Sequence, residues 1–352
     1  MMQNKIFYKM MNVVFSLIAL CFFFIDRGRV FFLKTIWLFS NILITLGLLF
    51  LIGCSQHSSV EQTWFKQDGK VKVLTTIAMI HDLVQKVGGD YVCSVPLIRG
   101  ELDPHSYELV KGDDEKFLTA DLIFYNGLGL EHGLSLRQNL EHNPKAIAVA
   151  NPLLEKTPNS ILIIDGEYDP HVWMDVALWV QTVDPIVEAL CRKDPTHASY
   201  YQQRGQIMIE EMKKTDEEIF NLLQTIPEEK RYLVTSHDAF NYFTLHYLAK
   251  PGEKDWALRC EAPEGLAPES QMSVNDIVSI ISHVEKYNVP VLFPESNVSR
   301  DSLRKIVSAG LKKGLKIRLC SHTLYGDSMG DVGSYLEMIL HNAKVIAEEL
   351  EK

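Results

Sequence analysis

The sequence predicts an α/β protein of two similar lobes, each with a mainly parallel sheet, joined by one long interlobe helix. Short β-branched runs alternate with amphipathic stretches from residue 72 and again from residue 231, which is the rhythm of βαβ units. A long helical stretch with few breaks separates the two series. We therefore expect an N-terminal lobe over 72–194, a linking helix over 195–226 and a C-terminal lobe over 227–352.

The N-terminal lobe is expected to contain alternating strands and helices. Short β-branched runs predict the strands, and apolar residues at helical spacing predict the helices. The strands are Lys72–Thr76, Val92–Leu97, Asp121–Asn126 and Ala146–Ala150, and the helices are Ala78–Val87 and Asp113–Ala120. In a parallel sheet the carboxyl ends of the strands meet at one edge, which is where open α/β sheets bind ligands.

The linking helix is predicted to begin at Asp194-Pro195, because proline suits the first turn of a helix. Ile219 and Leu223 belong to its apolar stripe, and neither glycine nor proline breaks the pattern after Gly205. A helix of about 30 residues would span about 45 Å, the length of a small domain.

The C-terminal lobe repeats the alternation. A final helix with apolar residues at helical spacing is expected to close the chain. The strands are Arg231–Thr235, Trp256–Cys260, Val289–Phe293 and Lys316–Leu319, and the helices are Ala239–Leu248, Val274–Tyr287, Asp301–Lys312 and Gly333–Leu350.

Residues 1–53 are predicted to be an export leader outside the fold. They contain two apolar runs, Val13–Ile25 and Thr35–Ile52, and the second has a basic flank typical of a secretory signal. This run ends in Gly53-Cys54, which resembles a bacterial lipobox, where the cysteine is lipidated and becomes the new N-terminus. A polar tether is expected to follow over residues 54–71. The chain is therefore expected in the periplasm or cell envelope, lipid-anchored to a membrane through Cys54.

Two alternatives for the leader stay open. A non-ATG start near Val30 would remove the first apolar run and leave an ordinary signal. In the second alternative, the two runs form an uncleaved helical hairpin and Cys54 merely follows a membrane helix, although the first run is short for a span.

Charge separates this leader from the body of the chain. The 352 residues carry a formal net charge of −10, and residues 1–53 hold five basic residues and one acid. Subtracting this +4 from −10 leaves −14 for residues 54–352. An acidic body argues against nucleic-acid binding, which requires basic patches that neutralise phosphates.

The four cysteines beyond the leader are widely spaced. Cys93, Cys191, Cys260 and Cys320 form no CxxC pair, so a zinc ribbon is excluded. An exported chain can form disulfides, and Cys260 and Cys320 are the expected pair because they share the C-terminal half. Buried free thiols explain these residues equally well.

Three of the twelve histidines stand where a predicted strand ends or a helix starts. His105 and His171 each follow Asp-Pro, and His237 follows the strand Arg231–Thr235 closely. Asp327 lies in a glycine-containing loop after the last predicted strand. Three imidazoles and one carboxylate suit a divalent transition metal in four- or five-fold coordination.

Five segments in order carry a family resemblance. They are LDPHSYEL, DPHVWMD, VTSHDAFNYF, LFPESNVS and LYGDSMG. Together they resemble the metal-specific solute-binding proteins of bacterial ABC importers, the cluster with a helical backbone whose members bind manganese, iron or zinc. The resemblance extends from Lys72 to Lys352 and implies a metal carrier, not an enzyme.

The resemblance also implies roles for single residues. His105 and His171 would be ligands from the N-terminal lobe, and His237 and Asp327 would be ligands from the C-terminal lobe. Glu295, in the Glu-Ser segment, would orient the C-terminal lobe around the ion. The resemblance assigns no role to Asp238, but its place directly after His237 predicts that it orients that histidine or begins a helix.

The implied partners are one divalent metal ion per chain, an ABC permease and its ATPase, with the chain itself a monomer. In this family, manganese binders often have Glu at the position of His237, and zinc-selective members often carry a His-rich loop between the first two ligands. Residues 106–170 contain only His132 and His142, so no such loop is present. We therefore expect iron or manganese as cargo, with zinc binding in vitro because of the Irving–Williams order.

Two other functions, a chelate receptor and a zinc hydrolase, fit the sequence less well than a metal carrier. A siderophore or haem receptor shares the long-helix architecture, but it needs arginine or aromatic clamps rather than three histidines and an aspartate. A zinc hydrolase needs an open coordination position and a general base, and the HExxH motif is absent. Adhesion as a second role stays open.

Overall fold

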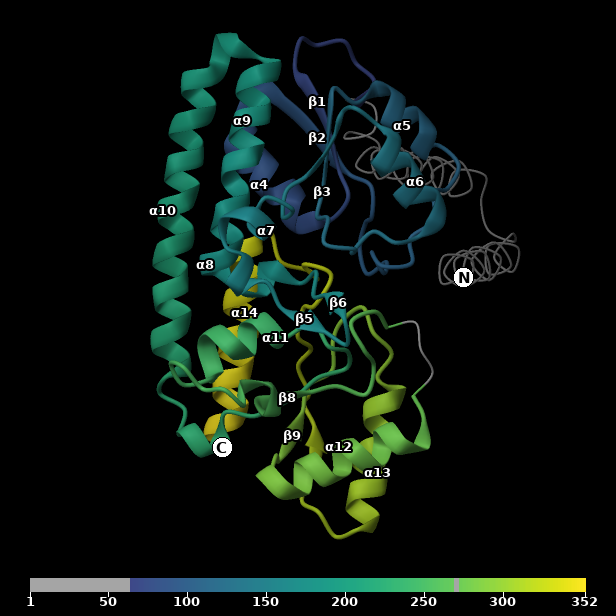
Figure 1. The fold of residues 1–352 in the computed structure, drawn as a ribbon, viewed down its shortest axis with the longest axis vertical. Coiled ribbons are helices and arrows are strands. Elements are labelled where there is room, and N and C mark those ends of the chain that lie inside the picture. The colour runs from purple at the N-terminus through teal and green to yellow at the C-terminus, as the bar shows by residue number, and fades with distance from the viewer. Residues whose placement is uncertain (1–63, 269–271) are drawn as a thin grey trace, which may run out of the picture. The chain divides into compact units, whose positions relative to one another are not determined.

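The computed structural model describes residues 64–268 and 272–352, and the chain divides after Thr63 into two units. The second unit, Trp64–Lys352, holds both lobes and the long helix (Figure 1). The expected leader and Cys54 lie outside the described residues. Across the described ranges, no helix combines the length and apolar character that a membrane span requires.

The N-terminal sheet has four parallel strands in the order β2-β1-β3-β4. In its centre, Val73 of β1 is level with Ser94 of β2 and Leu122 of β3. Every residue of β1 is buried, as expected for a parallel strand covered on both faces. The strands are β1 (Val71–Thr75), β2 (Val92–Pro96), β3 (Leu122–Tyr125) and β4 (Ala146–Ala148).

Helices cover both faces of this sheet. Val73 packs on one side in the core cluster that includes α4 (Ala78–Gly88) and α9 (Val183–Lys193). Leu74 packs on the other side with residues of α5 (Asp113–Thr119) and α6 (Leu134–His142), because successive side chains of a strand point to opposite faces. The remaining elements are α7 (Leu153–Lys156), α8 (Val176–Trp179), the hairpin β5–β6 (Ile163–Ile164, Glu167–Tyr168) and 3-10 turns at Gly89–Tyr91, Pro158–Ser160, Val172–Met174 and Val180–Thr182.

The folded unit begins before residue 72. Trp64 is 1% exposed and packs in one apolar cluster with Leu74 and Ile123. Residues 64–71 were expected to belong to the tether, yet they anchor the lobe through this indole. A single tryptophan in a polar stretch was the available signal.

The long helix α10 (Ala198–Leu223) follows a 3-10 turn at Pro195–His197 and contains 26 residues. At about 1.5 Å per residue it is about 39 Å long. It packs against α4 and α9 of the N-terminal lobe and against the C-terminal helix α14 (Tyr335–Glu351) (Figure 1). Its buried residues join a core cluster that contains residues of both lobes. The helix therefore links the lobes by packing as well as by chain connection.

The C-terminal lobe contains two pairs of parallel strands, β7–β8 and β9–β10. The Phe293 amide donates to the Val234 carbonyl at 2.8 Å, so β9 lies beside β7 and the order is β8-β7-β9-β10. The elements are β7 (Leu233–Val234), β8 (Cys260–Glu261), β9 (Val291–Leu292), β10 (Arg318–Leu319), α11 (Asn241–Phe243), α12 (Val274–Tyr287), α13 (Asp301–Lys312) and a 3-10 turn at Glu228–Lys230. The expected α/β class with parallel sheets and one long helix is confirmed.

Two expected elements of this lobe take another form. The expected strand Trp256–Cys260 is a 3-10 helix over Trp256–Arg259, and only its last residue enters β8. The turn directs Arg259 inward, where its guanidinium lies 2.8 Å from Glu253. The expected helix Ala239–Leu248 begins at Asn241 and ends as a π-helix over Thr244–Leu248.

The expected disulfide between Cys260 and Cys320 is not formed, and both are buried free thiols. Cys260 lies on β8, whereas Cys320 directly follows β10, at the opposite edge of the strand order. Three steps of about 4.8 Å between strands put their backbones about 14 Å apart. A disulfide requires Cα atoms within about 7 Å. The shared position of Cys260 and Cys320 in the C-terminal half was therefore not enough to predict a disulfide between them.

Candidate metal centre

The two Asp-Pro-His segments form the same local turn. The Asp103 carboxylate accepts a hydrogen bond from the His105 amide at 2.8 Å. In the second segment, the Asp169 carboxylate accepts one from the His171 amide at 3.0 Å. Aspartate commonly closes such turns onto the backbone two residues ahead, and the intervening proline restricts φ. Each turn therefore presents its imidazole in a defined direction.

Asp169 also orients the ring of His171. Its Oδ1 lies 2.7 Å from His171 Nδ1, and both side chains are fully buried. Its other oxygen accepts from Asn241 Nδ2 at 3.1 Å, and its carbonyl accepts from the Tyr242 hydroxyl at 3.0 Å. A carboxylate on Nδ1 leaves Nε2 free to bind a metal, an arrangement common in metalloproteins. This role of Asp169 was not predicted from the sequence, although the repeated Asp-Pro-His was a signal for it.

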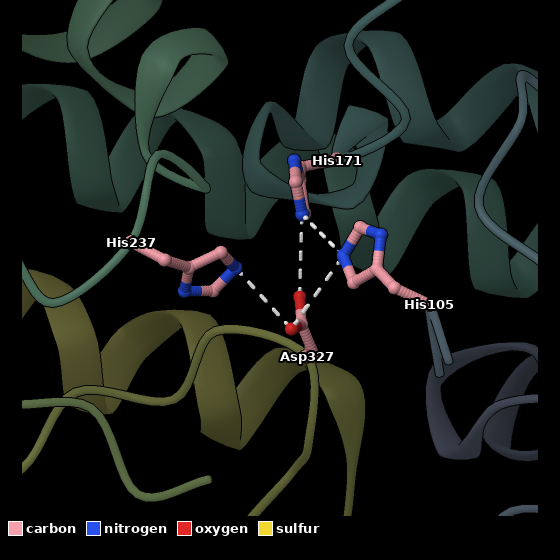
Figure 2. Close-up of side chains that lie close together, drawn as sticks. All are labelled: His105, His171, His237 and Asp327. Carbon is pink, nitrogen blue, oxygen red and sulfur yellow. Dashed lines mark hydrogen bonds and ion pairs between the residues drawn. The ribbon is translucent and has the colours of Figure 1, made fainter. Parts of the chain in front are cut away.

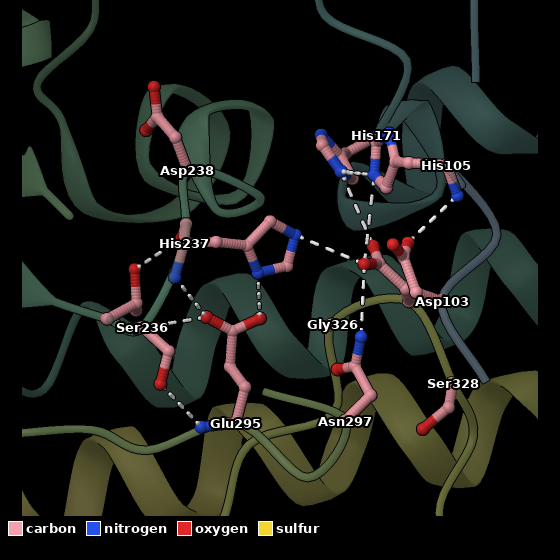
Figure 3. Close-up of polar contacts among 12 residues, drawn as sticks. Asp103, His105, His171, Ser236, His237, Asp238, Glu295, Asn297, Gly326 and Ser328 are labelled. Atoms are coloured by element: carbon pink, nitrogen blue, oxygen red, sulfur yellow. Dashed lines mark hydrogen bonds and ion pairs between the residues drawn. The ribbon is translucent and has the colours of Figure 1, made fainter. Parts of the chain in front are cut away.

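Glu295 holds His237 in the C-terminal lobe. One carboxylate oxygen accepts from the amides of Ser236 and His237 at 3.0 and 2.9 Å. The other oxygen lies 2.7 Å from His237 Nδ1 (Figure 3). Ser236 completes the contact because its hydroxyl accepts from the Glu295 amide at 3.1 Å. Backbone and ring of His237 are thus held by one side chain, and Nε2 points away from Glu295.

Asp327 approaches from the loop after β10. Its Oδ2 accepts from Asn297 Nδ2 at 3.1 Å. The carbonyl of the preceding Gly326 accepts from the indole of Trp173 at 3.0 Å. Trp173 belongs to the same short segment as His171, so this bond ties the two loops that carry ligands from different lobes.

The four side chains converge on one point (Figure 2). Asp327 Oδ1 lies 3.3 Å from His171 Nε2, and Asp327 Oδ2 lies 3.2 Å from His237 Nε2 and 3.7 Å from His105 Nε2. His105 Nε2 and His171 Nε2 are 3.2 Å apart. One ligand atom from each residue fits within a 4.8 Å span, and all four residues are buried. Ligands around 2 Å from a common ion have separations of this size.

The ion-pair partners shift the titration of the site. Burial alone lowers the pKa of His171, but Asp169 and Asp327 outweigh it and raise that pKa to about 9. Burial likewise opposes the charge of His237, yet Glu295 and Asp327 hold its pKa well above the usual value. Burial lowers the pKa of His105 to about 3 despite the attraction of Asp327. A metal ion must therefore displace protons from His171 and His237, so acidification opposes binding.

Some buried atoms of the site have no hydrogen-bond partner. Among the described residues, neither His237 Nε2 nor Asp327 Oδ1 makes a hydrogen bond, although both are shielded from solvent. Buried polar atoms are normally satisfied. Burial would raise the pKa of Asp327, but the surrounding imidazoles, His237 first, hold it well below its usual range. The set therefore offers an anionic oxygen and imidazole nitrogens to a cation.

The structure brings five of the six expected side chains to the site. Asp238 is the exception, because its carboxylate points away from the His237 ring (Figure 3). Its backbone amide instead donates to the Gly265 carbonyl at 3.2 Å, and its carbonyl accepts from Asn241 Nδ2 at 3.2 Å. Adjacent residues of an extended segment project in opposite directions, so the Asp238 carboxylate and the His237 ring lie on opposite sides of the backbone.

Replacing Gly326 with alanine is expected to weaken metal binding about tenfold or more. A Cβ there would lie 2.2 Å from Glu295 Oε2 and 3.1 Å from His237 Cε1. The carboxylate would have to leave His237, and losing such a supporting contact costs about 10–100-fold in affinity. Calorimetric titration with the metal measures this. Gly265→Ala is the matched control, since a Cβ at Gly265 meets open space, and equal affinities of the two variants would contradict the prediction.

Comparisons with known proteins show the family to which this chain belongs. The family model described as ZnuA, zinc-uptake complex component A, periplasmic, matches residues 73–349. Metal-binding protein YtgA of Chlamydia muridarum is 42% identical over 309 residues, which cover 86% of this chain and 94% of that protein. Manganese-binding lipoprotein MntA of Bacillus subtilis is 29% identical over 309 residues, covering 86% and 95%.

A solved structure extends the comparison to the fold. The crystal structure of Fe(III)-bound YtgA from Chlamydia trachomatis superposes with a TM-score of 0.77 at 41% identity, and the match covers 80% of this chain and 98% of that chain. The family match and the relatives confirm the resemblance seen in the five segments. The chain therefore belongs to the ZnuA family of extracytoplasmic metal-binding proteins, which serve ABC transporters by binding a metal ion for transport and are not enzymes.

Proposed function

We propose that His105, His171, His237 and Asp327 together bind one divalent transition-metal ion and that this ion is the transported cargo. The observation that carries the proposal is the convergence of four buried ligand atoms within 4.8 Å. Three imidazole nitrogens with one carboxylate suit a first-row transition metal. With both Asp327 oxygens engaged, the ion would be five-coordinate.

Ligand chemistry orders the candidate ions. Imidazole-rich sets favour Fe²⁺ and Zn²⁺ over Mn²⁺, and zinc binds more tightly than iron or manganese in the Irving–Williams order. The names of similar proteins mention Fe(III), manganese and zinc. We propose iron or manganese as the physiological cargo, with zinc binding in vitro.

The same geometry disfavours a bulky chelate as cargo. The carboxylate oxygens of Asp327 lie 3.3 Å from His171 Nε2 and 3.2 Å from His237 Nε2, and all three side chains are shielded from solvent. This spacing suits a bare ion whose entire first shell the protein supplies. A siderophore or haem would bring its own ligands and would leave the buried imidazoles without a role.

Delivery and location complete the proposal. We place an N-terminal lobe at 64–194, a linking helix at 195–226 and a C-terminal lobe at 227–352, with the ion captured between the lobes. The loaded monomer would dock on the permease and release the ion there. Lipidation of Cys54 would keep the protein at the membrane surface, as the word lipoprotein in the name of MntA suggests for that relative.

Elemental analysis tests the proposal. Purified full-length protein, stripped by a chelator and reloaded with Zn²⁺, Mn²⁺ or anaerobic Fe²⁺, is expected to hold one ion per chain, with zinc the tightest. Protein recovered directly from its native cells is expected to carry mainly iron or manganese. Binding that requires an added siderophore or haem would overturn the proposal, and so would failure to retain any free ion.

A further inference from the structure

A second cluster of titratable side chains lies away from the metal ligands. His246 of the π-helix lies between two carboxylates: its Nε2 is 3.0 Å from Asp216 Oδ1 on α10, and its Nδ1 is 3.7 Å from Asp175 Oδ2. Asp175 caps α8 by accepting from the Leu178 amide. The three residues therefore come from the N-terminal lobe, the linking helix and the C-terminal lobe.

Tyr247 adds two hydrogen bonds to these contacts. Its hydroxyl donates to Asp216 Oδ1 at 2.7 Å and accepts from the Val176 amide at 3.3 Å. Val176 directly follows Asp175, so the π-helix is held to the N-terminal lobe at two adjacent residues. The wider π-turn lets His246 and its neighbour Tyr247 both reach Asp216.

The arrangement fits a protonated imidazole better than a metal ion. A metal would use one ring nitrogen, whereas here each nitrogen of His246 faces a different carboxylate. Burial by itself lowers the pKa of His246, but Asp216 and Asp175 outweigh burial and raise it above its usual value. The titratable groups facing the ring are Asp175, Asp216 and Tyr247, with Tyr335 of α14 next to the two carboxylates. Side-chain exposures of 28%, 17% and 20% for His246, Asp175 and Asp216 let solvent protons reach the cluster.

This cluster is connected to the metal centre through one short segment. Residues 171–176 begin with His171 and end at the two residues that contact the π-helix. Between them, the Trp173 indole donates to Gly326, next to Asp327, and the Trp173 carbonyl accepts from the Tyr335 hydroxyl at 2.7 Å. A change at Asp175 and Val176 therefore reaches one ligand directly and a second through Trp173.

We propose that His246, when protonated, ties the two lobes together through Asp175 and Asp216 and thereby slows release of the bound metal. A histidine with a raised pKa contributes stability that is fully present below its unfolded pKa and is lost as the pH rises through its folded pKa. The tie is therefore closed while His246 is protonated and opens as the pH rises through its raised pKa. The effect of this tie on metal release rests on the proposed function, whereas the contact of His246 with Asp175 and Asp216 does not depend on it.

The test compares His246→Gln with the unmodified protein over a range of pH. Metal dissociation, measured by trapping the released ion with a chromophoric chelator, is expected to be about fivefold faster in the variant at pH 6.5, the effect of a partly buried ion pair. The two rates are expected to converge as the pH rises through the raised pKa of His246, because the imidazole then loses its charge. Asp216→Asn should reproduce the effect.

His197→Gln is the matched control. His197 Nδ1 lies 2.7 Å from Asp194, also partly buried, but this pair sits three residues apart in one segment and joins no lobes. Its dissociation rates should equal those of the unmodified protein at every pH. Identical pH profiles for His246→Gln and the unmodified protein would overturn the tie, as would the loss of a second bound ion in that variant, which would assign the cluster to a metal.

Unfolding of the metal-free protein separates this proposal from the proposed function. The unmodified protein should exceed His246→Gln in stability at pH 6, and the gap should shrink as the pH rises. This holds even if no metal binds at the four ligands. A gap that stays constant from pH 6 to 9 would contradict the tie independently of any metal measurement.

Discussion

Replacing His171 with alanine is expected to lower metal affinity by more than about a hundredfold, because even the loss of residues that only support a ligand costs about 10–100-fold. The substitution removes a nitrogen from the proposed shell and also removes the ring partner of the Asp169 carboxylate, which is fully buried. Calorimetric titration of the chelator-stripped protein measures the loss. Thermal unfolding of the same sample shows whether the variant is folded.

His132→Ala is the control for this experiment. The His132 ring lies 5.6 Å from the His105 ring, yet His132 is not one of the four converging residues. Its replacement should change the affinity by less than about threefold, within the usual scatter of surface substitutions. A folded His171→Ala protein that keeps its affinity would remove His171 from the ligand set.

Glu295→Gln is expected to lower metal affinity by about 10–100-fold while leaving the fold intact. The amide oxygen of glutamine can still accept from the backbone of Ser236 and His237, so the loop stays in place. The amide nitrogen, however, cannot accept a hydrogen bond from His237 Nδ1, and the ring loses the nearby negative charge that makes Nε2 a strong donor to a metal. Titration with the metal at fixed pH measures the change.

Asp238→Asn provides the contrast, because Asp238 is the adjacent carboxylate that the sequence analysis expected to support the site. The Asp238 side chain points away from the His237 ring (Figure 3), so the metal affinity of the Asp238→Asn variant should equal that of the unmodified protein. An equal loss in both variants would mean that general charge, rather than the contact with Nδ1, supports His237.

The four proposed ligands could be predicted from the sequence because each occupies a position that local rules can identify. His105 and His171 follow Asp-Pro turns, and His237 and Asp327 follow strands whose carboxyl ends share one edge of a parallel sheet. The class of fold was equally accessible, since the alternation of strand and helix repeats over the chain. These features depend on neighbours in the sequence or on the direction of strands.

Features that depend on contacts outside the local sequence pattern could not be predicted from the sequence. The role of Asp169 requires Asn241 and Tyr242 from the other lobe, and the inward turn at Arg259 requires Glu253. Cys260 and Cys320 were expected to pair because they share a lobe, but strand order, which short strands do not reveal, keeps them apart. Local pattern thus locates functional residues better than it locates their supports.

The C-terminal helix has a consequence for when this protein becomes active. The Tyr335 amide donates to Asp82 at 3.1 Å, and its hydroxyl bonds Trp173, so the last 18 residues complete contacts of the first lobe. Chains are synthesised from the N-terminus, and Asp327 emerges 222 residues after His105. The proposed set of four ligands is therefore complete only after the loop that carries Asp327 has been synthesised, so a shorter nascent chain cannot offer all four side chains to one ion.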